Sequence, residues 1–288
     1  MTQPENTALF EAQRPRLLRL AYRMLGSVAE AEDVVQDAWL RWSEASGIDS
    51  PPAWLTRVVT RLCLDRMKSA RARRETYFGT WLPEPLLEVE SESIADDVTL
   101  TLMLALERLS PLERAAFLLH DVFEVSLGDV AATLGRDAAA VRQLAVRARR
   151  HVQESKSRYT VEDGEAERIA QAFFTAARDG DTAALQAMLA ENVVIHADGG
   201  GRVLAFRNPI RGIARVLRLY ASLFRKFGGA ATLLRTLRID GLPGFVSLDR
   251  GDVLQTTALA IEDGRISAIY IVRNPDKLGH VVQALPVN

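Results

Sequence analysis

Five polar side chains suited to recognising bases and phosphates fall close together in the sequence: Arg142, Gln143, Arg147, Arg149 and Arg150. Gln143, Arg147 and Arg150 are spaced i, i+4 and i+7, which places them on one face of a helix. Arginine forks match phosphates and guanine edges, and glutamine matches adenine. The pattern predicts a helix that reads duplex DNA, with Arg136 just before it.

The residues around this helix predict a helix-turn-helix from about 110 to 151. Ser126-Leu127-Gly128-Asp129 resembles an N-terminal capping box, Gly135 ends the short helix that follows, and Asp137 caps the next one. Small and aliphatic side chains recur at helical spacing on the inward faces of both helices. The alternative is a solvated basic face on an ordinary helical hairpin, which the combined caps, turn and packing make less favourable.

A second basic segment, from Arg57 to Arg74, contains seven basic residues and one acid, Asp65. An aromatic ring among cations suits single-stranded nucleic acid, since bases stack on the ring while phosphates pair with the cations. The predicted DNA-contacting set of this segment is Trp54, Arg57, Arg61, Lys68 and Arg71. Taken alone, Trp54 is better explained as a core residue at the start of a helix, and the second DNA-binding segment downstream is what favours the nucleic-acid interpretation.

Acidic residues occupy one face of an earlier predicted helix, at Glu30, Asp33 and Asp37, with Gln36 beside them. Like charges at i, i+4 destabilise a helix slightly. The stripe therefore predicts a docking surface for a basic partner, and a merely solvated face is the alternative.

The overall composition is that of an ordinary globular protein, with a formal net charge of −1 over 288 residues. Local basic stripes matter more for DNA binding than this total. Cys63 is the single cysteine and there are four histidines, so we expect no disulfide, metal or cofactor. The sequence shows no apolar run of membrane-spanning length and no secretory leader, which predicts a cytoplasmic protein with no membrane partner.

The elements that would position these residues are helical at first. Residues 1–75 predict three or four helices, with starts at Ser27 and Ser50, and residues 76–94 predict a linker rich in proline and glycine. Trp81-Leu82-Pro83-Glu84-Pro85 is too apolar for a solvated tether, so part of it should dock on another surface. Helices resume over 95–158, with a capping box at Ser110-Pro111-Leu112-Glu113.

The remainder, residues 162–288, predicts a separate α+β domain. Helices are expected at about 163–179, 182–190 and 210–226. A strand is expected at 193–196, and period-two alternation from 231 to 272 predicts antiparallel strands. His196 and Asp198 lie two apart on a strand and could form an acid–base pair. A turn at Asp198-Gly199-Gly200-Gly201 is the simpler interpretation, as it is for Asn274-Pro275-Asp276.

Several of these motifs resemble a bacterial family. Ala31 to Leu40 and Ala53 to Val58 resemble the core-binding region of alternative sigma factors of the extracytoplasmic function group. Leu109 to Phe117 and Ala140 to Leu144 resemble their second DNA-binding region. The resemblance implies a promoter-specificity subunit with no catalytic residues. Residues 1–75 would bind core polymerase and the −10 element, and residues 95–158 would bind the −35 element.

The resemblance also assigns residues and partners. Core polymerase, through the clamp helices of its largest subunit and through its flap, would be bound by Asp33, Gln36, Asp37 and Leu40. The Trp54 set would hold the melted −10 element, and Arg136 with the five polar residues of the recognition helix would read the −35 duplex. We expect a monomer whose affinity for free DNA is low.

A further resemblance covers the whole chain, to the subgroup with a C-terminal SnoaL-like domain, whose fold is a cone with a curved antiparallel sheet. It implies regulatory interdomain contacts by Trp81 to Pro85, Asp198 to Gly201, and Asn274, Pro275, Asp276, Lys277 and Leu278. The sign of the regulation stays open, and the pocket of such a domain could take an unknown small ligand. The alternative function is a cyclase- or isomerase-like enzyme fused to a DNA-binding module.

Overall fold

The computed structural model describes residues 3–75, 77, 79–87, 100–153 and 162–284. The chain forms two compact units. The first comprises residues 1–75 and 101–156, and the second comprises residues 76–100 and 157–288. Among the described residues, no helix is both long and apolar enough to cross a membrane.

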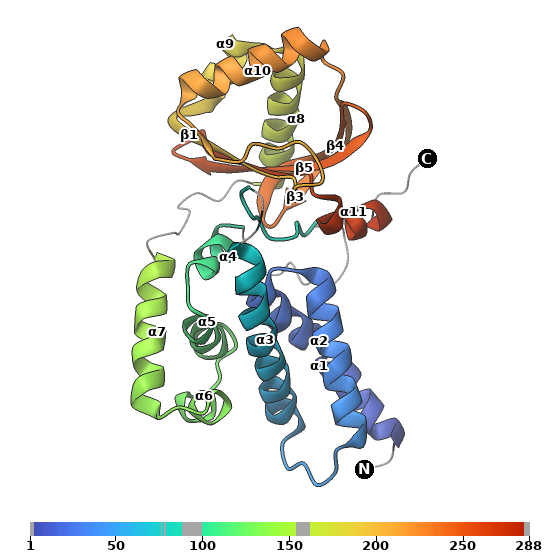
Figure 1. Ribbon diagram of the computed structural model, residues 1–288, viewed down its shortest axis with the longest axis vertical. Coiled ribbons are helices and arrows are strands. Elements are labelled where there is room, and N and C mark those ends of the chain that lie inside the picture. The colour runs from blue at the N-terminus through green and yellow to red at the C-terminus, as the bar shows by residue number, and fades with distance from the viewer. Residues whose placement is uncertain (1–2, 76, 78, 88–99, 154–161, 285–288) are drawn as a thin grey trace. The chain divides into compact units, whose positions relative to one another are not determined.

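The first unit is built from helices (Figure 1). Their bounds are α1 Gln3–Leu25, α2 Val28–Glu44, α3 Pro51–Glu75, α4 Leu100–Glu107, α5 Pro111–Phe117, the π-helical turn η1 Leu118–Val122, α6 Leu127–Leu134 and α7 Ala138–Gln153. The predicted caps form. Ser27 Oγ accepts from the Glu30 amide, and Ser110 and Glu113 make a reciprocal capping box. Gly135 ends α6 with φ 61°, in the left-handed region that glycine adopts without strain.

The apolar stripes of these helices make one core. Leu17, Leu20, Val35, Leu55 and Val59 are at most 2% exposed, and they come from α1, α2 and α3. Helix α3 also packs on α5 and α6 within the same unit. The two helical regions that the sequence separates by a linker are therefore in contact in this unit.

The second unit contains a six-stranded sheet in the order β2-β1-β6-β5-β4-β3. The strands are β1 Leu189–Asp198, β2 Ile210–Arg211, β3 Thr232–Ile239, β4 Leu242–Asp249, β5 Val253–Glu262 and β6 Arg265–Val272. The helical elements are α8 Asp163–Asp179, α9 Thr182–Met188, α10 Ile213–Phe227, the 3-10 turn η2 Pro275–Lys277 and α11 Gly279–Ala284.

The α+β prediction is confirmed, with one difference in strand direction. Strands β1 and β6 pair in parallel, while the other four pairings are antiparallel, so the sheet is mixed rather than wholly antiparallel. Alternation of apolar and polar residues reports which face a side chain takes. It carries no information on the direction of a neighbouring strand that is distant in sequence.

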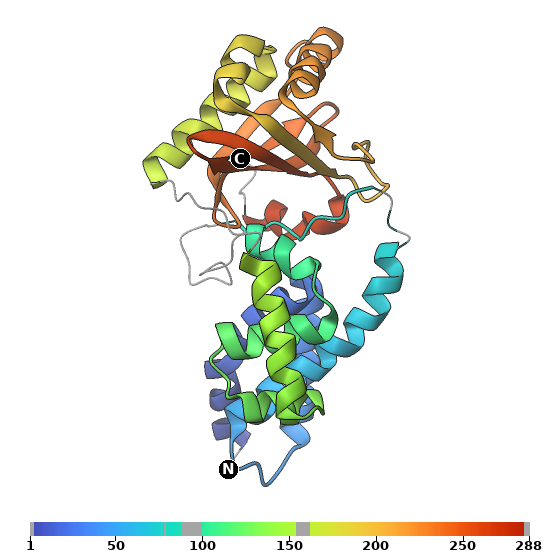
Figure 2. The same cartoon turned by 90° about the vertical axis from the view of Figure 1, so that its left-hand side faces the viewer.

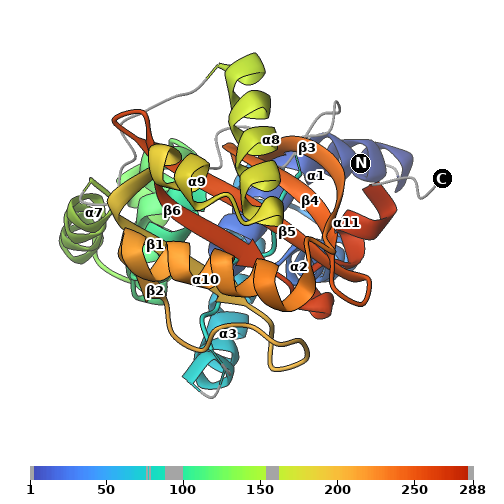
Figure 3. The ribbon, with the colours of Figure 1, turned by 90° about the horizontal axis from the view of Figure 1, so that it is seen from above.

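Helices α8, α9 and α10 cover one face of the curved sheet, as the view from above shows (Figure 3). Helix α11 and the linker segment 79–87 lie on the other face (Figure 2). The core under the helices includes Phe173, Leu185, Ile195, Phe245 and Ile269, which are at most 3% exposed.

Candidate polymerase and promoter interface

Helices α6 and α7 form the predicted two-helix frame. Ser126 Oγ accepts from the Asp129 amide at the start of α6, and Asp137 accepts from the Ala140 amide at 2.7 Å at the start of α7. The inward face of α7 is buried through Val141, Leu144, Ala145, Ala148 and Val152. Burial of this face fixes the rotation of α7, so its opposite face must point to solvent.

The outward face of α7 carries the predicted readout residues. Arg136, Arg142, Gln143, Arg147 and Arg150 are exposed, and Arg149 is half-buried. The side chains of Arg142, Gln143 and Arg150 make no hydrogen bond or ion pair within the described part of the chain. They are free to meet a ligand.

Two of the arginines on α7 are held by acids of neighbouring elements. Arg147 Nε lies 2.9 Å from Glu113, and Arg149 Nε lies 2.5 Å from Asp121. Burial acts to raise the pKa of Glu113. Hydrogen bonds from Ser110 and the charge of Arg147 outweigh it and lower that pKa. These acids orient the two guanidinium groups and leave their remaining nitrogens available.

The basic face of α3 is partly used inside the protein. The Trp54 ring packs on the Trp42 ring with centroids 5.7 Å apart, and Trp54 is half-buried. Arg61 is exposed and donates to the Thr133 carbonyl at 3.4 Å, while Lys68 pairs with Asp65 at 2.8 Å. Trp54 therefore has a packing role besides any contact with a base.

Arg57 and Arg71 are the other two α3 residues predicted to contact DNA. Arg57 is half-buried, and its buried Nε has no hydrogen-bond partner among the described residues. Arg71 lies within α3, but its side chain is outside the described residues.

The acidic face of α2 is exposed, and Arg66 of α3 bridges two of its carboxylates. Asp33 and Gln36 are exposed, Asp37 is half-buried, and Leu40 is 55% exposed. Arg66 donates to Asp33 at 3.3 Å and to Asp37 at 3.1 Å. The two carboxylates keep side-chain exposures of 65% and 45%, so an incoming cation can still reach them.

A buried arginine that sequence reasoning missed joins the two helical regions. Arg114 is 1% exposed, donates to the Met24 carbonyl at 2.7 Å and the Leu106 carbonyl at 2.9 Å, and pairs with Glu107 at 2.8 Å. Met24 lies in the last turn of α1, where carbonyls lack helical partners and a cation is favourable. The Leu109 to Phe117 motif contains Arg114, but nothing in its type or spacing showed that it is buried.

The second unit contains a buried polar cluster centred on Asp198. This carboxylate is 0% exposed. It accepts from the Tyr77 hydroxyl at 2.5 Å, the Leu82 amide at 2.9 Å, the Gly200 amide at 3.0 Å and Lys277 Nζ at 2.8 Å. Two of these donors belong to the linker, so Asp198 attaches the linker to the C-terminal domain.

Lys277, in η2, also attaches the linker to the C-terminal domain. Its ammonium donates to the Leu82 carbonyl as well as to Asp198, and it lies 4.2 Å from the centre of the Trp81 ring. A desolvated cation over an aromatic face is attractive. Pro83, Glu84 and Pro85 are buried here as well.

Asn274 and the glycine turn close the cluster. Asn274 accepts from the Asp276 amide at 3.1 Å, as its turn-and-cap interpretation predicts, and it also donates to the Tyr77 hydroxyl at 3.0 Å. Gly200 has φ 62°, and a Cβ there would lie 2.3 Å from the Asn274 side chain. The close approach of the turn to Asn274 therefore requires glycine at 200.

The remaining predicted contact residues lie at the edge of the cluster. Leu278 is 2% exposed, and Asp276 forms an exposed pair with Arg202 at 3.4 Å. Gly199 is buried and Gly201 is exposed.

Tyr77 and the Leu86–Asp240 contact are linker attachments that sequence reasoning missed. Burial and the Asp198 carboxylate raise the pKa of Tyr77, so its hydroxyl stays protonated and donates. Leu86 exchanges two hydrogen bonds with Asp240, and the Pro85 carbonyl lies 2.6 Å from His280 Nε2. A single tyrosine in a linker gave no periodic signal that could have singled it out.

The acid–base pair considered for His196 and Asp198 does not form. The His196 ring stacks on Tyr270 with centroids 5.2 Å apart, and burial together with Arg211 lowers its pKa. The Asp198 carboxylate is already committed to four donors. Among the described residues, no three His, Cys, Asp or Glu side chains come together as metal ligands would.

Comparison with known proteins identifies the class. The family models for Sigma-70 region 2 and Sigma-70, region 4 match residues 9–73 and 99–152. The ECF RNA polymerase sigma factor SigJ of Mycobacterium tuberculosis is 38% identical over 286 residues, covering 93% of this chain and 91% of the relative. The probable ECF RNA polymerase sigma factor SigI of the same species is 32% identical, covering 94% of each chain.

A solved structure agrees over the full length. The crystal structure of the extracytoplasmic function sigma factor SigJ of Mycobacterium tuberculosis superposes with a TM-score of 0.78 at 34% identity, covering 98% of this chain and 100% of that one.

The helix-turn-helix and the two matched regions define a sigma-70-type transcription factor. The chain belongs to the extracytoplasmic function family of RNA polymerase sigma factors, and it carries a fused SnoaL-like α+β domain. Proteins of this family bind core polymerase and direct it to promoters.

Proposed function

We propose that this sigma factor selects its promoters by inserting α7 into the major groove of the −35 element. The observation that carries the proposal is the free polar face of Arg142, Gln143 and Arg150 on a helix whose opposite face is buried. Arginine and glutamine side chains reach guanine and adenine edges in that groove, and each good bidentate pair discriminates between bases by about 1–3 kcal/mol. Arg136, Arg147 and Arg149 then contact phosphates and set the register.

The −10 element is assigned to α3, as opened DNA. Arg57 and Arg61 supply cations along one face, and the buried Nε of Arg57 still lacks an acceptor among the described residues. Lys68 continues this face, and Arg71 follows it in the sequence. Trp54, supported from behind by Trp42, offers a ring edge or face to an unstacked base.

Core polymerase is assigned to the exposed acidic face of α2, Asp33, Gln36, Asp37 and Leu40. Two carboxylates beside an exposed leucine form a mixed surface that fits basic, amphipathic helices such as the clamp helices of the largest subunit. The region 95–158 is assigned to the flap as well as to DNA.

Regulation is assigned to the attachment of the linker by the C-terminal domain. The sequence places 24 residues, 76–99, between the end of α3 and the start of α4. Fully extended they span at most about 86 Å, at up to about 3.6 Å per residue. With Tyr77 and residues 79–87 attached, the 12 residues 88–99 are left to reach α4, and they span at most about 43 Å. Attachment therefore limits how far the two DNA-binding regions can separate.

The alternative of a cyclase- or isomerase-like enzyme has less support. The one acid that the sequence offered for catalysis, Asp198, is fully buried and accepts four hydrogen bonds. We infer that its role is to attach the linker.

Run-off transcription with core polymerase tests the DNA assignments. Gln143→Ala and Arg150→Ala should each reduce initiation, and the loss should follow the −35 sequence. The Gln143 variant should relax base preference at one position, worth roughly 1–3 kcal/mol. Gln153→Ala, an exposed polar residue at the end of the same helix, serves as the matched control. Equal transcription by all four proteins on every −35 variant would refute the assignment.

A further inference from the structure

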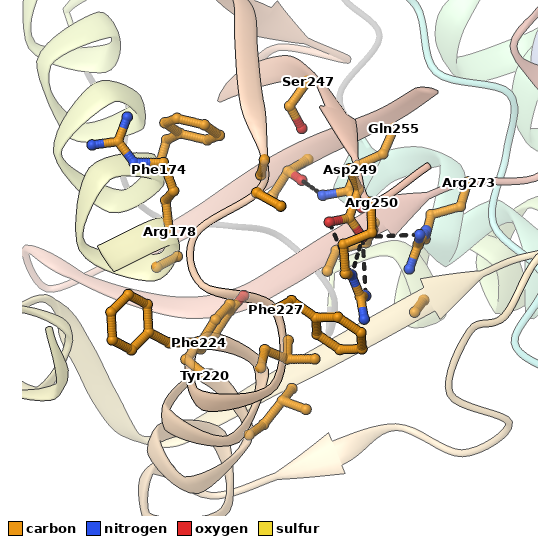
Figure 4. Close-up of a pocket in the computed structure, with 18 of the residues that line it drawn as sticks. Phe174, Arg178, Tyr220, Phe224, Phe227, Ser247, Asp249, Arg250, Gln255 and Arg273 are labelled. Atoms are coloured by element: carbon orange, nitrogen blue, oxygen red, sulfur yellow. Dashed lines mark hydrogen bonds and ion pairs between the residues drawn. The ribbon is translucent and has the colours of Figure 1, made fainter. Parts of the chain in front are cut away.

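The C-terminal domain contains an open cavity of about 370 Å³ between α8, α10 and the sheet (Figure 4). This volume falls within the range of about 300–1,000 Å³ that is typical of small-molecule sites. Packed aromatic rings line the cavity: Phe173 lies edge-on to Tyr220 at 5.8 Å, and Phe174 lies edge-on to Phe245 at 5.3 Å. The cavity therefore offers flat apolar walls.

Apolar side chains at the cavity are exposed to solvent in this structure. Leu204 is 84% exposed, Phe224 is 42% exposed and Phe227 is 36% exposed, and all three line the cavity. Covering such surface with an apolar molecule removes it from water, which favours binding. An apolar ligand would gain this contribution.

One end of the cavity carries an excess of positive charge. Arg250 and Arg273 both pair with the single carboxylate of Asp249, at 3.0 Å and 2.9 Å (Figure 4). Lys226 also lines the cavity, and its Nζ lies 5.3 Å from the centre of the Phe227 ring. Burial acts to raise the pKa of Asp249, but the hydrogen bonds from Arg250 and the charge of Arg273 lower it, so this carboxylate stays ionised. It neutralises one of the two guanidinium groups.

Arg273 has spare donor capacity. Its side chain is 12% exposed, and its buried Nε has no hydrogen-bond acceptor among the described residues. A buried donor without an acceptor costs free energy, which an anionic oxygen would relieve. Arg250 lies over the Phe227 ring at 4.0 Å, which joins the charged end to the aromatic wall.

From this arrangement we propose that the cavity is a binding site for a small aromatic carboxylic acid. The ring system lies between Tyr220, Phe224 and Phe227, and the carboxylate accepts from Arg273 and Arg250. Neutral aromatic molecules gain the apolar contacts alone, and aromatic cations are repelled by the excess charge.

Three probes of one shape test the class of ligand: 2-naphthoate, neutral 2-naphthamide and cationic 2-(aminomethyl)naphthalene, titrated calorimetrically into the full-length protein. A charge-assisted hydrogen bond in a partly buried site predicts that the acid binds about 10-fold or more tightly than the amide. The cation should bind most weakly. Equal affinities, the opposite order or no binding of the acid at millimolar concentration would overturn the proposal.

Two variants and a control locate the site. Arg273→Gln leaves Asp249 paired with Arg250 and should remove the preference for acid over amide without weakening the amide. Phe227→Ala, at a partly exposed ring, should weaken both probes. Arg218→Gln changes an exposed arginine on α10 that does not line the cavity, and it should change neither. If Arg273→Gln and Phe227→Ala both bind like the wild type, the site is elsewhere and the proposal fails. No polymerase or DNA is present, so the result is independent of the proposed promoter function.

Discussion

Replacing Lys277 by methionine should raise the population of molecules in which the linker is detached from the C-terminal domain. Methionine keeps an unbranched side chain of similar length but removes the cation that bridges Asp198 and the Leu82 carbonyl. Lys277 is 8% exposed and Asp198 is 0% exposed, so solvent cannot replace the lost charge.

The free-energy cost of the Lys277→Met substitution depends on how deeply the ion pair is buried. Removing one partner of a buried ion pair costs about 3–5 kcal/mol, because the other charge is left uncompensated. Here Asp198 would keep three donors, from Tyr77, Leu82 and Gly200, so we expect a value near the lower end, about 3 kcal/mol. This corresponds to roughly a 100-fold increase in the population of the detached linker.

Hydrogen–deuterium exchange of the segment 77–87 measures this population. The Leu82 amide donates to buried Asp198 and should exchange roughly 100-fold faster in Lys277→Met, as expected for local opening. Thermal unfolding run alongside separates local release from global loss of the fold. Lys277→Met/Asp198→Asn should restore part of the protection because no unpaired charge remains.

The Arg202–Asp276 pair provides a matched control beside the same turn. Its side chains are 67% and 62% exposed, and exposed pairs contribute about 0–1 kcal/mol. Arg202→Met should leave exchange of the linker almost unchanged. Protection of Leu82 that is equal in the wild type and in Lys277→Met would refute the contribution of Lys277 to the attachment of the linker.

The remaining predictions concern both units. Arg114→Leu should lower the free energy of unfolding of the helical unit, measured by urea denaturation, by about 3–5 kcal/mol. The reason is that Glu107 and two backbone carbonyls lose a buried cation. A change below about 1 kcal/mol would contradict this. Arg114→Lys should recover little, since one ammonium cannot match the guanidinium fork. Burial lowers the pKa of His196 in the folded state, so the unfolded state binds more protons as the pH falls below about 6.5, and stability should fall with it. His196→Gln should flatten thermal stability between about pH 5 and 6.5, and an unchanged slope would exclude His196 as its source. Gly200→Ala should speed hydrogen–deuterium exchange of the linker amides, because the new Cβ clashes with the Asn274 side chain. Exchange at the wild-type rate would show that the turn can shift to accommodate the Cβ.

Much of the helical unit follows from local sequence signals. The Ser110 capping box and the Gly135 turn form because they satisfy helix-end groups within a few residues of themselves. The exposed face of α7 followed from the same periodicity. Its pairing of Arg147 with Glu113 and Arg149 with Asp121 did not, because those acids come from separate elements.

The contacts of the linker were only partly predictable from the sequence, because they join residues that are far apart along the chain. Its apolar character predicted that it docks, and the resemblance singled out Asp198 and Lys277. Tyr77 and Asp240 joined the same attachments through contacts 121 and 154 residues apart in sequence. The cavity's charged end has a similar origin, since β4 and its turn supply Asp249 and Arg250, and Arg273 follows β6. Such groupings depend on strand order, which alternation alone does not specify.

Reading of the −35 element by α7 is tested most directly by run-off transcription of fragmented genomic DNA, with core polymerase and this protein, followed by sequencing of RNA 5′ ends. We predict new start sites that share two upstream elements at a fixed spacing. Gln143→Ala should alter the preferred sequence of the upstream element and leave the downstream one unchanged. Start sites identical to those of core polymerase alone, or a Gln143→Ala profile identical to the wild type, would contradict the account.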